Sequence, residues 1–527
     1  MGVPGVWKLL KIIEQKISLH HLAVSTGFIG NATGKRAFRV GIDASSWMCR
    51  ACALHGNTES PQLVGLFGRC ARLFGLPFIP IFVFDGPLRP SMKRGKIVKG
   101  TDHWLTKSFQ SMLEGFRFDW FTAPGEAEAT LSAMTSSGIP CRIDAILTDD
   151  SDAFVFGAEV VLRIRSEDND NYSASRYSAF DITQQLGLTR YDLILIALLA
   201  GGDYSDGVDG YGITTAVGLA QAGLGQQLFQ GQNGLSYTDS AVFLDRWRLS
   251  LQSELRTNAS GKLQHRYPAL AAKIPDNFPA LDVINLYLRP IVAERDTPIS
   301  LALNSAKLDV LARFAEAHFG WGDSIGILTH FADSLFAGLV VRGLVYAALA
   351  VDSPSPSSLT LTSTVGTIVG NRAHKSTGFL AELRLVPEIS PEVLTSALGA
   401  IHGERDPAGG AEAAVADWIK TRLPKTRAWV PRAMVEHVYP SLVLDYVSAK
   451  ESKRSRKKPS PRMPPGPSSS RAATNTEGKT RVLRASALRS QNVEGSSAPL
   501  PKRYTVFTVT HHGQEVLELV SDSDGEL

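Results

Sequence analysis

Cysteine is scarce in this chain of 527 residues, with only four copies. So few thiols exclude a disulfide framework, and the one CxxC pair, Cys49 and Cys52, has no second pair with zinc spacing. Uninterrupted apolar runs of about 20 residues are also absent, so we expect no membrane-spanning helix. Because no cleavable signal precedes Asp43, the sequence predicts a protein of a reducing, soluble compartment.

A large excess of one charge is lacking as well, since the formal net charge is only +4. Nucleic-acid binding, if present, must therefore come from basic residues concentrated on one surface. Hydrophobic residues make up 44% of the chain, which is enough for a substantial core, and the length allows two or more domains.

Acidic residues, by contrast, gather in five short packets where an apolar segment ends or a helix begins. Three segments, RVGID, IPIFVFD and DAILTDDSD, are β-rich and stop at an acid, as buried parallel strands do at the carboxyl edge of a sheet. A fourth packet, APGEAEA, starts a predicted helix, and the fifth is LLAGGDYSDG. Together they contain Asp43, Asp85, Glu126, Glu128, Asp150, Asp152 and Asp203, called here the acidic cluster.

Clustered carboxylates repel one another unless a cation lies among them. Hard oxygen ligands suit Mg²⁺ or Mn²⁺, and two such ions about 3.5–4 Å apart can stabilise both the attacking water and the leaving oxygen of a phosphodiester. Any one of these acids alone could be a helix cap or a turn residue. The whole set, placed at such edges, favours a site for two metal ions.

The packets, together with MGVPGVWKLL, FVFDGP and GGDYSDGVDGYGITTA, resemble the flap-endonuclease superfamily of structure-specific 5′ nucleases over about residues 1–300. The resemblance implies an α/β nuclease core with a mostly parallel central sheet flanked by helices. It also implies that the acidic cluster binds two Mg²⁺ ions, with Mn²⁺ as a substitute. Within DDSD the family spacing selects Asp150 and Asp152, which leaves Asp149, like Asp206, as a capping or solvated acid. Gly2 is expected near the active site and the DNA.

A basic stretch, GPLRPSMKRGKIVKG, follows Asp85. In the family a Lys and an Arg of an arch contact the scissile phosphate, which implies catalytic roles for Lys93 and Arg94 and a DNA contact for Arg89. The alternative is a solvated basic surface that touches only the DNA backbone. Because 41 positions separate Asp85 from Glu126, the arch is short, which disfavours threading of a free 5′ end and favours the Holliday-junction resolvase branch.

A glycine-rich segment after Asp203 resembles the helix–two-turn–helix element of the family, expected at about residues 200–225. Glycine allows the backbone to approach a duplex phosphate closely, often with a bound K⁺ ion in relatives. The resemblance implies DNA contacts from Gly207, Gly210, Gly212, Thr214 and Thr215.

The pattern divides the chain into four regions. Residues 1–110 form an N-terminal nuclease region with the short arch, and 111–350 form an internal region completed by core-packing helices. Residues 365–448 resemble the chromodomain-like module of eukaryotic resolvases, which helps to hold DNA, and 449–527 read as a disordered basic and acidic tail. Four aromatic residues of the module could form a methyl-lysine cage or simply its core, namely Trp418, Trp429, Tyr439 and Tyr446.

The tail contains two candidate signals. The basic run AKESKRSRKK is typical of nuclear localisation or a DNA-backbone patch, although a solvated linker has the same composition. Val516–Val520 with the acids that follow resemble a SUMO-interacting motif, which adds a strand to its partner's sheet; the alternative is a sticky disordered end.

The sequence thus predicts a Mg²⁺-dependent nuclear endodeoxyribonuclease that resolves Holliday junctions by paired symmetric nicks and also cuts 5′ flaps and replication forks. We expect a monomer in solution and a homodimer on the junction, with no membrane association. Two alternatives stay open: a monomeric 5′ flap endonuclease or excision-repair nuclease, and a non-catalytic DNA-junction scaffold. The presence of every acid in the cluster disfavours the scaffold.

Overall fold

The computed structural model divides into two compact units, Met1–Lys458 and Pro459–Leu527, each considered by itself. The residues that it describes are 2–56, 59–98, 101–136, 138, 141–164, 173–231, 237–294, 299–353, 363–403, 406, 411–456, 504–511 and 514–521.

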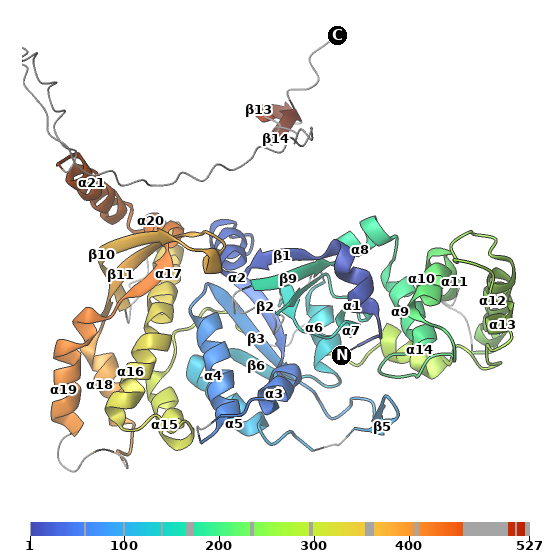
Figure 1. Ribbon diagram of the computed structural model, residues 1–527, viewed down its shortest axis with the longest axis horizontal. Coiled ribbons are helices and arrows are strands. Elements are labelled where there is room, and N and C mark those ends of the chain that lie inside the picture. Colours follow the sequence, from blue (N-terminus) through green and yellow to red (C-terminus); the bar gives the residue numbers. More distant parts are fainter. Residues whose placement is uncertain are drawn as a thin grey trace, which may run out of the picture. The chain divides into compact units, whose positions relative to one another are not determined.

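A seven-stranded sheet lies at the centre of the first unit (Figure 1). Its order is β1-β9-β8-β7-β2-β3-β6. The strands from β8 to β6 run parallel, and β9 is antiparallel to both of its neighbours, β8 and β1. The predicted mostly parallel sheet is therefore confirmed, and the strands that end in acids are neighbours in it. The strands are β1 (Gln15–Ser18), β2 (Phe38–Asp43), β3 (Phe78–Phe84), β6 (Asp119–Thr122), β7 (Ala145–Leu147), β8 (Val160–Arg163) and β9 (Ser173–Ser178).

Helices cover both faces of this sheet, because its central strands are apolar on both sides. In β3, Phe82 packs into the hydrophobic cluster on one face and Ile81 into the cluster on the other. One face is covered by α3 (Ala44–Cys52), α4 (Pro61–Phe74) and α5 (Thr106–Phe116). The other is covered by α6 (Ala127–Met134), α7 (Asp152–Val155) and α9 (Arg190–Ala200).

The order of the strands creates a ligand-binding edge. The chain runs from β2 to β3 and β6 on one side, then returns to β7 and β8 on the other side of β2. Open α/β sheets bind ligands outside the carboxyl ends of the strands at such a reversal. Asp43 is the last residue of β2, Asp85 follows β3 and Asp150 follows β7, so all three reach this edge.

The basic stretch after Asp85 forms a β-hairpin of β4 (Met92–Lys93) and β5 (Lys96–Ile97). Its two-residue turn places Arg94 at φ 50° and Gly95 at φ 67°, the type I′ pattern favoured in tight hairpins. The predicted short arch is therefore a hairpin. Short elements elsewhere around the sheet are α1 (Val6–Leu9), η1 (Leu10–Ile13), α2 (Leu19–His21), η2 (Leu22–Ile29) and α8 (Ala179–Leu186).

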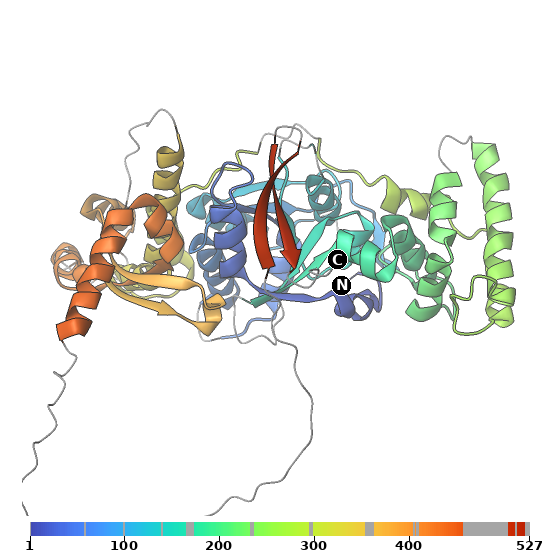
Figure 2. The same cartoon turned by 90° about the horizontal axis from the view of Figure 1, so that it is seen from above.

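A helical extension follows α9 and lies at the opposite end of the first unit from the C-terminal module (Figure 2). After α9 the chain makes two turns with Gly207 at φ 81° and Gly210 at φ 85°, and a helix resumes at Ile213. This backbone course agrees with the predicted helix–two-turn–helix. The helices are α10 (Ile213–Gln221), α11 (Leu224–Gly231), α12 (Tyr237–Thr257), α13 (Pro268–Ala271) and α14 (Leu281–Leu288).

Three further helices lie between the helical extension and the C-terminal module: α15 (Leu308–His318), α16 (Ser324–Ser334) and α17 (Phe336–Asp352). The packing role predicted for α14 and α15 is confirmed, since Ile284 and Leu311 are each 1% exposed. Among the described residues no single helix is long and apolar enough to cross a membrane; α16 and α17 reach that length only as a pair bent by 51°.

Arg342 of α17 is a buried cation with few partners, lying 4.3 Å from the ring centroid of Phe74. One hydrogen bond reaches the Asn304 carbonyl at 2.9 Å, and burial lowers the pKa of the guanidinium to about 9. Replacing a poorly paired buried charge by an apolar side chain of similar size is often neutral or stabilising, so Arg342→Met should leave the unfolding free energy unchanged or raise it by about 1 kcal/mol. Urea denaturation checks this; Arg342→Ala, which also leaves a cavity, should lower it by about 3 kcal/mol.

The C-terminal module contains a three-stranded antiparallel sheet of order β10-β11-β12 followed by helices (Figure 1). The first strand was not anticipated by the sequence pattern, and it begins two residues before the predicted boundary at 365; the last helix runs beyond the predicted end at 448. The elements are β10 (Ser363–Ala373), η3 (Lys375–Thr377), β11 (Ala381–Ile389), α18 (Pro391–Gly399), α19 (Ala411–Thr421), η4 (Leu423–Lys425), β12 (Ala428–Pro431), α20 (Arg432–Val438) and α21 (Pro440–Arg456).

The aromatic residues of the module do not form an open cage. Trp418 is 7% exposed and packs in the hydrophobic cluster, while the Arg372 guanidinium lies 4.0 Å from the ring centroid of Trp429. Tyr446 donates its hydroxyl to Asn371. These contacts agree with the aromatic-core interpretation, because the ring face of Trp429 is already occupied by a cation.

The second unit contains an antiparallel hairpin of β13 (Tyr504–His511) and β14 (Gln514–Ser521). The prediction of a wholly disordered tail differs from the structure here, because alternating β-branched residues allow two adjacent segments to pair. Val516–Val520 lie in β14 and pair with Thr505–Val509. Most of the remaining tail, with the end of the basic run, lies outside the described residues.

Candidate active site

Asp43 and Asp85 are held by backbone donors at the ends of their strands. Asp43 caps α3, because its carboxylate accepts hydrogen bonds from the amides of Ser45 at 2.8 Å and Ser46 at 3.2 Å. Asp85 accepts from the Ser45 hydroxyl at 2.9 Å and from the Ala127 amide at 3.0 Å. The second bond ties the end of β3 to the first turn of α6, which carries the next two acids.

Glu126 and Glu128 occupy different positions at the start of α6. Glu126 is the N-cap residue with extended backbone, whereas Glu128 lies in the first helical turn. The DDSD packet bends back on itself, since the Asp152 amide donates to Asp150 at 3.0 Å. Asp203 follows α9 at the end of the same edge.

The acids of the cluster are buried and close together, so their ionised forms are disfavoured unless positive charge lies nearby. Asp43, Glu126, Asp150 and Asp152 are each at most 4% exposed. Burial, followed by the nearby Asp85 carboxylate, raises the pKa of Asp43 to about 7. Burial and then Asp150 likewise raise the pKa of Glu128 and of Asp152 well above the ordinary range. The set can be fully ionised only when cations neutralise it.

The hairpin after Asp85 supplies cations, as the sequence predicted. Lys93 Nζ pairs with Glu126 and lies 3.3 Å from Asp203 Oδ2. Burial acts to lower the pKa of Lys93, but Glu128, Glu126 and Asp203 raise it overall, so the ammonium stays charged. Arg94 donates from Nε to Asp203 Oδ1 at 2.8 Å.

Arg89 is the third cation of this group, and its guanidinium lies 3.5 Å from Asp85 Oδ2. The predicted basic residues therefore do lie against the acidic cluster. Lys93 is the most enclosed of the three, since its side chain is 27% exposed and pairs with Glu126.

The donors present fit a hard divalent cation. Within the described part of the chain, no group of three or more His, Cys, Asp or Glu side chains is arranged so that it could hold a metal ion. Two carboxylates of the cluster, Glu126 and Asp203, are paired with the Lys93 ammonium. Asp152 Oδ2 is buried and accepts no hydrogen bond from any described residue, which leaves a hard oxygen donor available.

Gly2 and Val3 pack against the acidic cluster. The Val3 amide donates to Asp152 Oδ1 at 2.8 Å, and Arg94 donates to the Gly2 carbonyl at 2.9 Å. Gly2 has φ 86°, and a Cβ atom there would lie 2.3 Å from Asp150 Oδ1. Gly2 therefore lies against the acidic cluster.

Gly2→Ala is expected to lower nuclease activity by about tenfold, the size of effect typical when groups that orient metal ligands are disturbed. The added methyl group would push on Asp150 and strain a backbone with positive φ. Single-turnover cleavage measures the effect. Gly34→Ala is a matched control, because Gly34 also has positive φ but no atom lies within 4 Å of its Cβ position; equal losses in the two variants would contradict the prediction.

The glycine turns before α10 present backbone to solvent. Gly210 and Gly212 are exposed, as is Thr214, whereas Thr215 is buried with 8% exposure. The side chain of Thr215 therefore packs inside the fold. Position 207 has no room for a side chain, because a Cβ atom there would lie 2.5 Å from the Gly201 nitrogen.

The neighbouring acids have other partners. Asp149 pairs with Arg50 and with Arg163, the latter at 3.1 Å, so it is an ion-paired residue and not a solvated cap. Asp206 is exposed, as expected. The choice of Asp150 and Asp152 within DDSD agrees with this geometry.

Tyr204 was missed by the sequence interpretation, although its hydroxyl donates a hydrogen bond to Glu126. Its position directly after Asp203 was the available signal. Ser45 was also missed, and its place two residues after Asp43 could have suggested the contact with Asp85.

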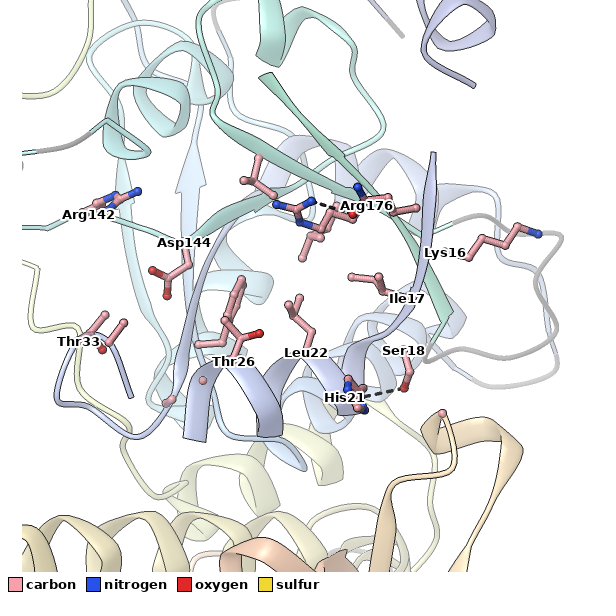
Figure 3. Close-up of a pocket in the computed structure, with 18 residues that line it drawn as sticks. Lys16, Ile17, Ser18, His21, Leu22, Thr26, Thr33, Arg142, Asp144 and Arg176 are labelled. Carbon is pink, nitrogen blue, oxygen red and sulfur yellow. Dashed lines mark hydrogen bonds between the residues drawn. The ribbon is translucent and has the colours of Figure 1, made fainter. Parts of the chain in front are cut away.

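A pocket of about 730 Å³ lies at the opposite edge of the sheet (Figure 3). It is lined by Phe38 and Val160, the first residues of β2 and β8, and by Asp144 before β7. Arg176 points toward it and donates to Gln15 at 2.9 Å. This pocket therefore does not belong to the acidic cluster.

Comparison with known proteins agrees with the fold and the site. Residues 117–203, which carry the acids from Glu126 to Asp203, match the XPG I-region family model. The chain is 30% identical over 257 residues to flap endonuclease GEN homolog 1 of Mus musculus, a match that covers 44% of this chain and 26% of the relative. It is 29% identical over 241 residues to the DNA repair protein RAD2 of Saccharomyces cerevisiae, covering 46% and 22%. The chain thus spans about a quarter of the length of these relatives.

Solved structures agree over a longer stretch. The Holliday junction-resolving enzyme GEN1 in complex with product DNA and Mg²⁺ is 28% identical, with a TM-score of 0.64 and coverage of 85% of this chain and 100% of that chain. The junction-resolving enzyme GEN-1 binding potassium gives 28% identity and a TM-score of 0.65 over the same shares. The matched nuclease fold and the family segment that contains the acids support the likeness of this chain to the flap-endonuclease/XPG superfamily.

Proposed function

We propose that this protein is a Mg²⁺-dependent, structure-specific endodeoxyribonuclease that resolves Holliday junctions by paired symmetric nicks and also cuts 5′ flaps and replication forks. The observation that carries the proposal is the meeting of the acidic cluster with Lys93 and Arg94 at the carboxyl edge of the sheet. The likeness to GEN1 bound to product DNA and Mg²⁺ supports the choice of substrate and metal.

In the proposed mechanism the acidic cluster holds two Mg²⁺ ions, with Mn²⁺ as a substitute. Bound there, the ions supply an activated water and neutralise charge on the phosphate. Lys93 and Arg94, released from part of their pairing with Glu126 and Asp203, then donate to the scissile phosphate and offset its developing charge. Asp43 and Asp85 are held in place by the amides at the starts of α3 and α6.

The substrate is proposed to be branched duplex DNA. A hairpin of this size leaves the site open to a duplex without a free end, which suits a junction better than a threaded flap. Duplex phosphates would be bound by the backbone around Gly207, Gly210 and Gly212, by Thr214 and by a K⁺ ion, as the likeness to GEN-1 with potassium suggests. Arg89 and Gly2 would contact the strand near the cut.

The remaining regions fit the same proposal. The module from residue 363 is proposed to be chromodomain-like and to hold a DNA arm, because it has three antiparallel strands with a C-terminal helix. Two symmetric cuts imply that the monomer forms a homodimer on the junction. The basic run ending α21 suits nuclear import, and the free edge of β14 suits SUMO binding.

Cleavage of an end-labelled, immobile four-way junction beside a 5′ flap in Mg²⁺ tests the proposal. Paired symmetric nicks that yield ligatable duplexes are expected. Cutting of the flap with an intact junction would instead assign the monomeric flap or excision-repair activity, which the likeness to RAD2 makes the second candidate. Junction binding without any cutting would assign the non-catalytic scaffold.

A further inference from the structure

Two tyrosines lie directly behind the acidic cluster. Tyr204 donates its hydroxyl to Glu126 Oε2, while Lys93 pairs with Oε1 of the same carboxylate. Tyr287 comes from α14, far along the chain, and its ring centroid lies 4.7 Å from that of Tyr204 at an interplanar angle of 49°. Phe156 adds a third ring, 6.0 Å from Tyr287. The aromatic group therefore joins α14 to a member of the acidic cluster.

The two contacts of Glu126, with Lys93 and with Tyr204, are not equally lasting in the proposed function. In the proposed function Lys93 must turn toward the scissile phosphate, so its bond to Glu126 is the one that yields. Tyr204 has no such second task, since its hydroxyl donates to the other oxygen of the same carboxylate. Once Lys93 turns away, Tyr204 is the side chain that still fixes the orientation of the Glu126 carboxylate.

Tyr287 supports the other side of the same segment. It is 0% exposed, and its hydroxyl faces the backbone groups of Asp203 and Tyr204. The hydroxyl also lies against the residue before Asp203, since a Cβ atom on Gly202 would be 2.4 Å from it. Phenylalanine would fill the same space but would remove the polar contact with this buried backbone. The hydroxyl therefore supports the Asp203 turn in addition to the packing of the ring.

We propose that Tyr204 and Tyr287 are positioning residues, which hold Glu126 and the Asp203 turn in the arrangement that binds the divalent metal. The inference rests on the proposed function and extends it to α14, for which the sequence indicated only a packing role. Groups that orient metal ligands through hydrogen bonds are needed for affinity even though they never touch the ion.

The test is Mn²⁺ binding to the full chain without DNA, measured by isothermal titration calorimetry. Tyr204→Phe and Tyr287→Phe are expected to raise the dissociation constant by about tenfold or more, the usual effect of losing an outer hydrogen-bonding partner. Tyr211→Phe is the matched control, because it removes a tyrosine hydroxyl that donates to the Leu270 carbonyl at 2.7 Å. That variant should keep the wild-type affinity.

A second readout separates positioning from loss of structure. Tyr204→Phe should cut slowly at low Mg²⁺ and recover toward the wild-type rate at saturating Mg²⁺, with an unchanged melting temperature in EDTA. If both Phe variants bind Mn²⁺ as tightly as the wild type, the inference is overturned while the proposed function stands. If the wild type binds no Mn²⁺, the proposed function fails and takes the inference with it.

Discussion

Asp150→Asn is expected to abolish cleavage of a four-way junction while leaving junction binding intact. Asp150 is 3% exposed, accepts the amide of Asp152 and lies beside Asp203, so it stands at the centre of the acidic cluster. An amide fills the same space but carries no charge and offers one oxygen. Because in the proposed mechanism the metal ions would supply both the nucleophile and the charge stabilisation, the rate should fall by roughly 1,000-fold or more.

Single-turnover cleavage and gel-shift binding on the same junction measure the two effects. Asp149→Asn is the matched control, since the adjacent acid pairs with Arg50 and Arg163 and not with the cluster. It should cut at nearly the wild-type rate. Cleavage that survives in Asp150→Asn but is lost in Asp149→Asn would mean that the wrong acids of DDSD have been assigned.

Lys93→Met is expected to reduce the cleavage rate by about 100- to 1,000-fold at saturating Mg²⁺, the range found when one group that stabilises developing charge is removed. Lys93 is the cation that reaches both Glu126 and Asp203, and it lies on the strand of the hairpin nearest the cluster. Methionine keeps the length of the side chain and loses the charge. Lys96→Met is the matched control, because Lys96 pairs with Lys93 across the hairpin and is exposed.

The same variant should reveal the role of Lys93 without metal. Removing the ammonium leaves the carboxylates to repel one another, so Lys93→Met should melt at a lower temperature than the wild type in EDTA. Mg²⁺ should then raise its melting temperature more than that of the wild type. A normal melting temperature in EDTA together with a normal cleavage rate would remove Lys93 from the active site.

The positions of the acids along the chain were predictable because local rules decide them. An apolar, β-rich run that ends in Asp, as at Asp43, can be recognised from the residues of one strand alone. Because the carboxyl ends of parallel strands meet at one edge of a sheet, such acids are expected to lie together. The hairpin was not predictable as such, because its form depends on Arg94 adopting positive φ with its tip bound to Asp203. The strand β10 was likewise missed, since its partner β11 is what stabilises it.

The sequence by itself determined the parallel sheet, the acids at its edge and the glycine turns after α9, because each follows from periodicity or backbone freedom within a short window. The resemblance already indicated the cations of the hairpin, but only the tertiary structure decided which acids they pair with and which tyrosines join the cluster. Lys93, Tyr204 and Tyr287 meet Glu126 and Asp203 from three separate segments, and their contacts depend on how α14 and the hairpin pack against the sheet. No local pattern encodes such a meeting, because its free energy comes from burial and charge pairing between residues distant in the chain.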